Sequence, residues 1–167
     1  MELMRTKGDV FAEVKAELVE QGFRIVEEDA KRPWGGFFVL DEGQAQAFAN
    51  RYFDGLDVHG LKISGKLSPK ILLVAPGTRL SWQYHHRRAE IWRLVKGLAG
   101  VCRSFTDVEG PVKALTVGEF ITLKQGERHR LVGLDAWGVV AEIWQHTDVL
   151  RPSDEDDIVR VQDDFGR

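Results

Sequence analysis

The sequence predicts a mainly β protein, a barrel or sandwich of short strands with helices at its N-terminal end. From residue 67 onward, short runs rich in β-branched and aromatic residues, such as PKILLVAPG (69–77) and WGVVAEIWQH (137–146), are separated by glycine-containing turns. No long helical pattern interrupts these runs, which is typical of barrels and two-layered β architectures. Helical spacing of apolar residues is found instead near the N-terminus.

Two helices and two strands are expected before the barrel. Residues 9–21 carry apolar side chains at helical spacing and can be capped by Asp9. Residues 41–53 place their apolar side chains on one helical face. The runs at 23–29 and 32–40 predict short strands between these helices.

The chain is expected to form one domain over residues 1–167. Its parts are an N-terminal helical extension (about 1–55), a barrel (about 60–150) and a C-terminal tail (151–167). A chain of 167 residues suits a single full-sized core.

Composition narrows the partners to a small molecule or another protein. The formal net charge is −3, and no basic stripe occurs, so the sequence predicts neither nucleic-acid nor membrane binding. No apolar run reaches the roughly 18 residues that span a bilayer, and the N-terminus has no secretory pattern. A single cysteine, Cys102, fits a reducing compartment, so we expect a cytoplasmic protein.

Potential metal ligands crowd the segment LSWQYHHRRAE (80–90). Side chains alternate faces along a strand, so Gln83 and His85 can share a face, which Glu90 can join after a turn. The alternative is a solvated polar edge, in which Glu90 is the counter-charge of the basic residues 85–88. Spacing within this segment alone does not separate the two interpretations.

A second segment, GEFITLKQGERH (118–129), favours the metal site. The two segments together resemble the two-part signature of the cupin superfamily, through the spacing of Gly77, Gln83, His85, Glu90 and Gly97, and of His129 three residues after Gly126. The resemblance implies a double-stranded β-helix, or jelly-roll barrel. It also implies one metal site made by Gln83, His85, Glu90 and His129.

The chain resembles one cupin family more closely. RPWG (32–35), the stretch 69–92 and the ending EDDIVRVQDDFGR (155–167) are similar to the type II mannose-6-phosphate isomerase domain, which is often the C-terminal half of a mannose-1-phosphate guanylyltransferase. Gln in place of His at the first ligand position, as at Gln83, is also that family's pattern. The resemblance covers roughly residues 32–167.

Five residues depart from the family pattern without removing a predicted ligand: Trp82, Arg87, Ile91, Lys124 and Gly133. The family usually has His at the positions of Arg87 and Ile91. These two departures leave three functions open. The first is a metal-dependent aldose–ketose isomerase acting on mannose 6-phosphate or a similar sugar phosphate. The others are a cupin that binds a sugar or its phosphate without turnover, and a cupin enzyme of another class, such as a dioxygenase or epimerase.

The isomerase interpretation requires one divalent metal ion, with Zn the first choice and Mn, Fe, Co or Ni as alternatives. It also requires cations for the phosphate and for the charge that develops on substrate oxygens. Lys70 and Arg160 are the predicted catalytic cations, and Arg79 and Arg88 are further candidates, although most such side chains on a small domain are simply solvated. The sequence does not assign the general base.

The tail (151–167) is acidic, yet the resemblance implies that it folds back over the metal-bearing mouth of the barrel. There it would place Arg160 near the substrate, with Asp156 and Asp157 holding the tail by ion pairs or caps. The apolar residues Ile158, Val161 and Phe165 could dock on the barrel. The resemblance also implies a homodimer, because many cupins pair through edge strands.

Overall fold

The computed structural model describes residues 5–61, 66–148 and 150–167. The helical elements are α1 (Lys7–Glu20), η1 (Glu42–Gln44), α2 (Ala45–Tyr52) and η2 (Val58–Gly60). The strands are β1 (Ile25–Arg32), β2 (Gly35–Leu40), β3 (Lys70–Val74), β4 (Trp82–Tyr84), β5 (Arg88–Ser104), β6 (Lys113–Ala114), β7 (Phe120–Leu123), β8 (Arg128–His146) and β9 (Val159–Gln162). The protein is therefore mainly β with N-terminal helices, as the sequence predicts.

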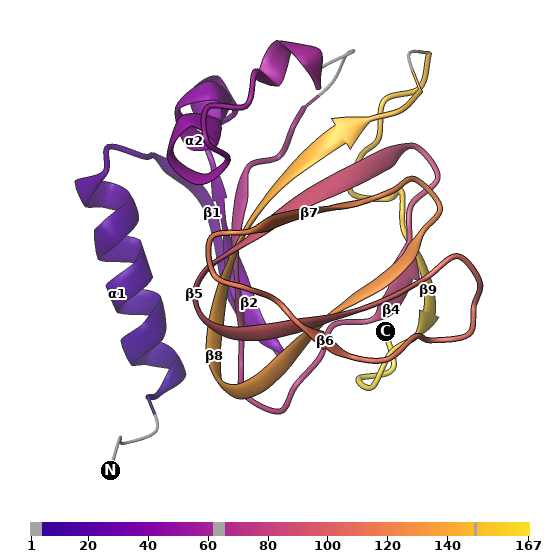
Figure 1. Ribbon diagram of the computed structural model, residues 1–167. Helices are drawn as coiled ribbons and strands as arrows, with labels where there is room; N and C mark the ends of the chain where they lie inside the picture. Colours follow the sequence, from indigo (N-terminus) through magenta and orange to yellow (C-terminus); the bar gives the residue numbers. More distant parts are fainter. Residues whose placement is uncertain (1–4, 62–65, 149) are drawn as a thin grey trace.

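The strands form a curved antiparallel sheet that closes into a barrel (Figure 1). One path runs β1-β2-β3-β8-β4-β9, while β5 pairs with β6, β7 and β8. The long strands β5 and β8 pair from Arg88↔His146 to Ser104↔Arg128 and join the two sides of the barrel. Figure 1 shows α1 on one side of the barrel and β4 and β9 on the other.

Alternation along the strands divides the apolar residues into two cores. Leu72, Leu94 and Val140 belong to the inner core of the barrel. Residues of the opposite phase on the same strands, such as Ile71 and Ile143, belong to an outer core, which the helices cover. Because side chains alternate faces, any residue in phase with the inner set points into the barrel. This phase decides which polar residues reach the site.

The helix α1 begins earlier than predicted, at Lys7 rather than at residue 9. Its N-cap is Thr6, whose side chain accepts a hydrogen bond from the Asp9 amide, and Asp9 in turn closes a capping box. The second helix is shorter than predicted, because residues 42–44 form a 3₁₀ turn before α2 starts at Ala45. In the described part of the chain, no helix has the length and apolar character needed to cross a membrane.

The N-terminal region also contributes β1 and β2 to the sheet, where β2 pairs with β3. Gly35 is the first residue of β2, directly after the turn from β1. It has φ +139°, and a Cβ there would lie 1.9 Å from the Leu73 carbonyl oxygen. Only glycine fits this close approach of two backbones. The turn is therefore fixed against β3.

The tail forms the edge strand β9 on β4, with Gln83 opposite Arg160 and Tyr84 opposite Val159. Of the apolar residues that were expected to dock, only Ile158 lines the barrel's cavity. Val161 and Phe165 are 37% and 39% exposed, so the expectation was wrong for these two. Backbone pairing with β4, rather than apolar contact, supports this end of the tail.

Candidate metal centre

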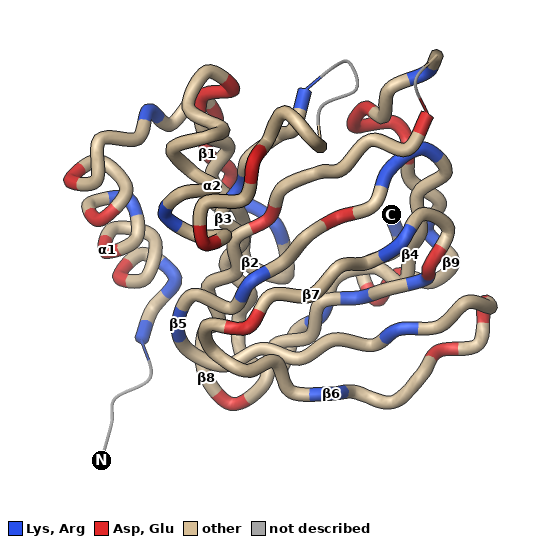
Figure 2. Tube along the Cα trace, turned by 45° about the horizontal axis from the view of Figure 1, so that its top comes forward, with Lys and Arg blue, Asp and Glu red and all other residues tan. Residues whose placement is uncertain are grey.

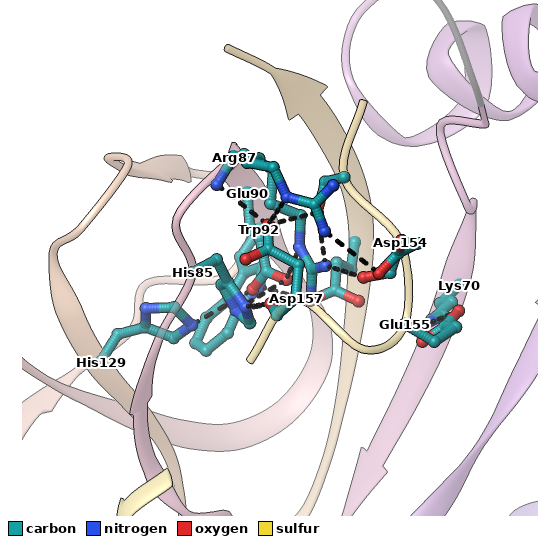
Figure 3. Close-up of polar contacts among 12 residues, drawn as sticks. Lys70, His85, Arg87, Glu90, Trp92, His129, Asp154, Glu155 and Asp157 are labelled. Atoms are coloured by element: carbon teal, nitrogen blue, oxygen red, sulfur yellow. Dashed lines mark hydrogen bonds and ion pairs between the residues drawn. The ribbon is translucent and has the colours of Figure 1, made fainter. Parts of the chain in front are cut away.

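Three buried side chains, His85, Glu90 and His129, converge inside the barrel (Figure 3). His85 directly follows β4, Glu90 lies on β5 and His129 lies on β8. The Nε2 atom of His85 lies 3.3 Å from Glu90 Oε2, and that of His129 lies 3.2 Å from Glu90 Oε1. The spacing in the sequence predicts this convergence, and the structure brings the three together.

Each of the two imidazoles forms a hydrogen bond through Nδ1 to a main-chain carbonyl oxygen. His85 Nδ1 lies 2.6 Å from the Asp157 carbonyl oxygen, and His129 Nδ1 lies 3.1 Å from that of Glu127. A carbonyl can only accept, so each Nδ1 carries the hydrogen and donates it. In the neutral rings, each Nε2 lone pair therefore faces the Glu90 carboxylate. Arg88 Nη2 lies 3.5 Å from His85 Nε2, whereas His129 Nε2 has no partner among the described residues. His129 Nε2 and Glu90 Oε1 are thus two acceptors that face each other, and this favours a cation between them.

At His85, burial favours a metal ion over a proton as this cation. Burial lowers the pKa of His85, and this outweighs the opposing charge of Glu90. Burial also opposes ionisation of Glu90, but His85 and Arg88 more than compensate and hold its pKa well below the usual range. Arg88 donates from Nε to Glu90 Oε2 at 3.0 Å. The result is an ionised Glu90 carboxylate beside the imidazole of His85, whose burial opposes its protonation.

The donor atoms fit a divalent ion. Among the described residues, Glu90 Oε1 and His129 Nε2 are buried and have no hydrogen-bond partner. Two ligands at about 2.1 Å from one ion in tetrahedral geometry would lie about 3.4 Å apart, close to the spacings found here. Two imidazoles and a carboxylate suit Zn and the neighbouring transition metals alike.

Gln83, the fourth predicted ligand, lies directly opposite His129 on the paired strands β4 and β8. It lines the same cavity. Its Oε1 accepts a hydrogen bond from Ser81 Oγ at 2.5 Å, which leaves a second lone pair on this amide oxygen. Gln83 thus stands next to the three converging residues, with a free acceptor position.

A cavity of about 140 Å³ opens beside the centre. Six basic side chains line it against three carboxylates: Arg32, Lys70, Arg88, Arg130, Arg160 and Arg167 against Glu90, Glu142 and Glu155. Figure 2 shows basic and acidic residues gathered around β4 and β9. The excess of basic side chains makes this cavity suited to an anionic ligand.

Both predicted catalytic cations, Lys70 and Arg160, line this cavity. The Lys70 ammonium lies 3.3 Å from Glu155 in the tail and 5.0 Å from the centre of the Trp144 ring. For Arg160, no ion pair or side-chain hydrogen bond occurs within residues 5–61, 66–148 and 150–167. Arg79 instead pairs with Asp164 at 2.6 Å and lies outside the cavity wall, so the structure does not support it as a site residue.

Sequence reasoning missed Glu142, a buried carboxyl group in the cavity wall. On β8 it lies opposite Lys70 on one side and Trp92 on the other, and the Trp92 indole donates to it at 3.0 Å. Burial, reinforced by the negative charge of Glu90, raises the pKa of Glu142 to about 8. Its signal in the sequence was a lone carboxylate within the apolar run 139–144, in phase with the inner residues of β8.

The two departures from the family pattern do not line the cavity. Ile91 belongs to the outer core between the sheet and the helices. Arg87 reaches the tail, donating from Nη1 to the Pro152 carbonyl at 3.0 Å. Neither residue therefore argues against a site inside the barrel.

The tail supports the centre through Asp157, one of the two residues expected to hold it. Its carboxylate accepts hydrogen bonds from the His86 and Arg87 amides at 2.8 and 2.9 Å and from Ser153 Oγ at 2.7 Å. Asp156 is exposed, and no contact of its carboxylate is found in the described chain. The expected pair of acidic anchors is thus reduced to Asp157.

Relatives with this sequence pattern are bacterial sugar-biosynthesis proteins. The family described as "Mannose-6-phosphate isomerase C-terminal" matches residues 53–163. The xanthan biosynthesis protein XanB of Xanthomonas campestris pv. campestris (strain B100) is 32% identical over 136 residues, which are 81% of this chain and 23% of that protein. A mannose-1-phosphate guanylyltransferase of Escherichia coli (strain K12) is 31% identical over 147 residues, which are 85% of this chain and 24% of that one. The chain thus spans about a quarter of the length of these relatives.

Solved structures with the same fold are cupins. Oxalate decarboxylase from Bacillus subtilis has a TM-score of 0.55 at 14% identity, over 80% of this chain and 29% of that chain. KdgF from Halomonas sp. has a TM-score of 0.51 at 14% identity, over 78% of this chain and 89% of that chain. These likenesses confirm the predicted cupin fold. The family match, which includes His85, Glu90 and His129, establishes that the chain belongs to the mannose-6-phosphate isomerase C-terminal family, a cupin family of sugar-phosphate or sugar-nucleotide enzymes.

Proposed function

We propose that this protein is a metal-dependent sugar-phosphate isomerase, which interconverts an aldose phosphate and a ketose phosphate of the mannose 6-phosphate type. The observation that carries the proposal is the buried His85–Glu90–His129 cluster, whose unpartnered donor atoms adjoin a cavity lined by basic side chains. Family membership supports the same substrate class.

The chain's residues divide between metal binding and substrate binding. His85, Glu90 and His129, with Gln83 beside them, would hold the ion. When bound, the ion supplies Lewis-acid stabilisation of negative charge on the substrate oxygens. Lys70 and Arg160, which line the cavity, would bind the phosphate or neutralise developing charge.

Isomerisation also requires a group that moves a proton between C2 and C1. Of the three carboxylates in the cavity wall, Glu90 belongs to the metal cluster and Glu155 pairs with Lys70 and Lys66. Glu142 is the remaining one, and its partner in the described structure is the Trp92 indole. We therefore assign proton transfer to Glu142.

The test is a coupled isomerase assay on the purified protein, together with elemental analysis of its metal content. We expect turnover of mannose 6-phosphate that a chelator abolishes and added divalent metal restores. His85→Ala should lose both metal and turnover, whereas His59→Ala, at an exposed position, should lose neither. A fully metal-loaded protein that converts neither hexose nor heptose phosphates would contradict the proposal.

A further inference from the structure

One residue of the cavity wall outside the His85–Glu90–His129 cluster, Trp34, has a buried polar atom without a partner. Trp34 lines the cavity and is 4% exposed, and its Nε1 has no hydrogen-bond partner among the described residues. Arg32, two residues earlier, also lines the cavity. Its Nε lies 3.0 Å from Asp29 Oδ2, but outside hydrogen-bond geometry. The β1–β2 turn thus brings two donor groups to the cavity wall.

The backbone of this turn is fixed. The Trp34 carbonyl accepts hydrogen bonds from the Ala75 amide at 2.9 Å and from Thr78 Oγ1 at 3.0 Å. The Arg32 carbonyl accepts one from Lys7 Nζ at 3.0 Å. With the main chain held at these points, the Trp34 side chain is attached to a rigid support rather than to a mobile loop.

A buried N–H without an acceptor is costly, so native proteins rarely keep one unless water or a ligand satisfies it. Indole and guanidinium groups are donors only, and both require an acceptor. The cavity that Trp34 lines favours an anionic acceptor, because six basic side chains line it against three carboxylates. Arg32 and Lys70 are two of these basic side chains, and they lie 5.4 and 5.8 Å from the centre of the Phe37 ring.

We propose that Trp34 Nε1, supported by Arg32, donates a hydrogen bond to a phosphate oxygen of the substrate and so helps to select phosphorylated sugars. This role rests on the proposed function, because it takes the ligand to be a sugar phosphate. Trp34 is then a specificity-determining residue that acts on the substrate and does not hold the metal.

The decisive variant is Trp34→Phe, which keeps an aromatic ring in the inner core but removes the N–H. We expect the Kd and KM for mannose 6-phosphate to rise roughly ten- to a hundredfold, as for the loss of a hydrogen bond to a charged acceptor. The Kd for unphosphorylated mannose, which lacks the phosphate, should be the same in the variant as in the wild type. Thermal unfolding without ligand checks that the variant remains folded, because a Phe ring fills less of the inner core than the indole does. Trp137→Phe is the matched control, because the Trp137 indole donates to the Arg5 carbonyl and lies outside the cavity wall.

A second readout does not depend on activity. The five tryptophans give five indole N–H signals in a ¹⁵N-labelled protein, and the Trp34 signal is identified by its loss in Trp34→Phe. Titration of the metal-loaded protein with mannose 6-phosphate or inorganic phosphate should move the Trp34 signal and leave that of Trp137 in place. A shift caused equally by mannose would assign the contact to a sugar hydroxyl and overturn the phosphate assignment.

The outcomes separate this inference from the proposed function. If mannose 6-phosphate is isomerised but neither the Trp34 signal nor the KM of Trp34→Phe responds, the subsite is wrong and the function stands. If phosphate moves the Trp34 signal but no sugar phosphate is converted, the subsite stands as an anion site and the isomerase proposal fails. If no phosphate compound binds, both are wrong.

Discussion

Replacing Asp157 by Ala should weaken metal binding, although the Asp157 carboxylate forms no hydrogen bond with the side chains of His85, Glu90 or His129 in the described structure. Its main-chain carbonyl orients His85, and its carboxylate fixes that segment of the tail by accepting two amide hydrogen bonds and one from Ser153. Without the carboxylate, the carbonyl is free to move away from His85 Nδ1. The imidazole then loses its fixed orientation and tautomer.

Two magnitudes follow from this geometry. Three hydrogen bonds to a buried charge, each worth about 1.5 kcal/mol, give a loss of roughly 3–5 kcal/mol in the free energy of unfolding. Loss of the hydrogen-bond acceptor that orients a metal-bound imidazole typically lowers metal affinity about 10- to 100-fold. We expect Asp157→Ala to fall in both ranges and Asp157→Asn, which keeps one acceptor oxygen, to lie between it and the wild type.

The assay is competition with a chelator of known affinity, alongside thermal unfolding of the metal-free protein. Asp156→Ala is the control, because this neighbouring carboxylate is exposed and makes no contact in the described chain. Burial opposes ionisation of Asp157, but the hydrogen bonds from Ser153 and His86 outweigh it and lower its pKa. Its stabilisation is therefore present above the unfolded value near 3.8 and is lost as the pH falls through the lower folded pKa. Wild-type metal affinity in Asp157→Ala, in a variant that remains folded, would refute the role of the tail in the centre.

Three further outcomes are expected. His129→Ala should lose the bound metal, measured by elemental analysis, and full occupancy would exclude His129 as a ligand. Truncation after Arg151 should abolish turnover and also weaken metal binding, because it removes Asp157 behind His85; a chelator competition that finds unchanged affinity would show that the tail acts on substrate alone. Glu142→Gln should stabilise the metal-free protein above pH 8 by on the order of a few kcal/mol, at roughly 1.4 kcal/mol per pKa unit. Glu142 ionises near 4.5 in the unfolded chain and near 8 in the folded one, so wild-type stability falls as the pH rises between these values. Parallel pH–stability curves for the two proteins would contradict the raised pKa.

The convergence of His85, Glu90 and His129 could be predicted in part from short-range spacing and in part only from the family resemblance. Alternation places Glu90 in phase with Trp92 and Leu94 on the inner face, and the resemblance supplies the second segment with His129. The same phase sends Ile91 outward, which the sequence alone did not resolve because the family usually has a polar residue there.

The position of Glu142 could not be predicted, because it depends on the register between strands far apart in the chain. Only the pairing of β8 with β5 and β3 sets it opposite Trp92 and Lys70. Trp34 is a similar case, since packing of the β1–β2 turn against β3 decides whether its ring lines a cavity or fills a core. Local sequence patterns do not encode such pairings over long distances.

The start of α1 was misplaced for a local reason. Asp9 is a good capping residue, but Thr6 precedes it by three positions and the two form a reciprocal pair of hydrogen bonds. In the order Thr-x-x-Asp, the first residue is the cap and the second lies inside the helix.

The support that Asp157 gives to His85 also has a consequence for the protein's synthesis. A chain is made from its N-terminus, and the barrel strands through β8 emerge before residue 157 does. A nascent chain that stops short of this residue can hold His85, Glu90 and His129 but lacks the carbonyl that orients the first of them. High-affinity metal capture should therefore begin only after β9 has docked on β4, which makes loading of the ion a late event in the protein's maturation.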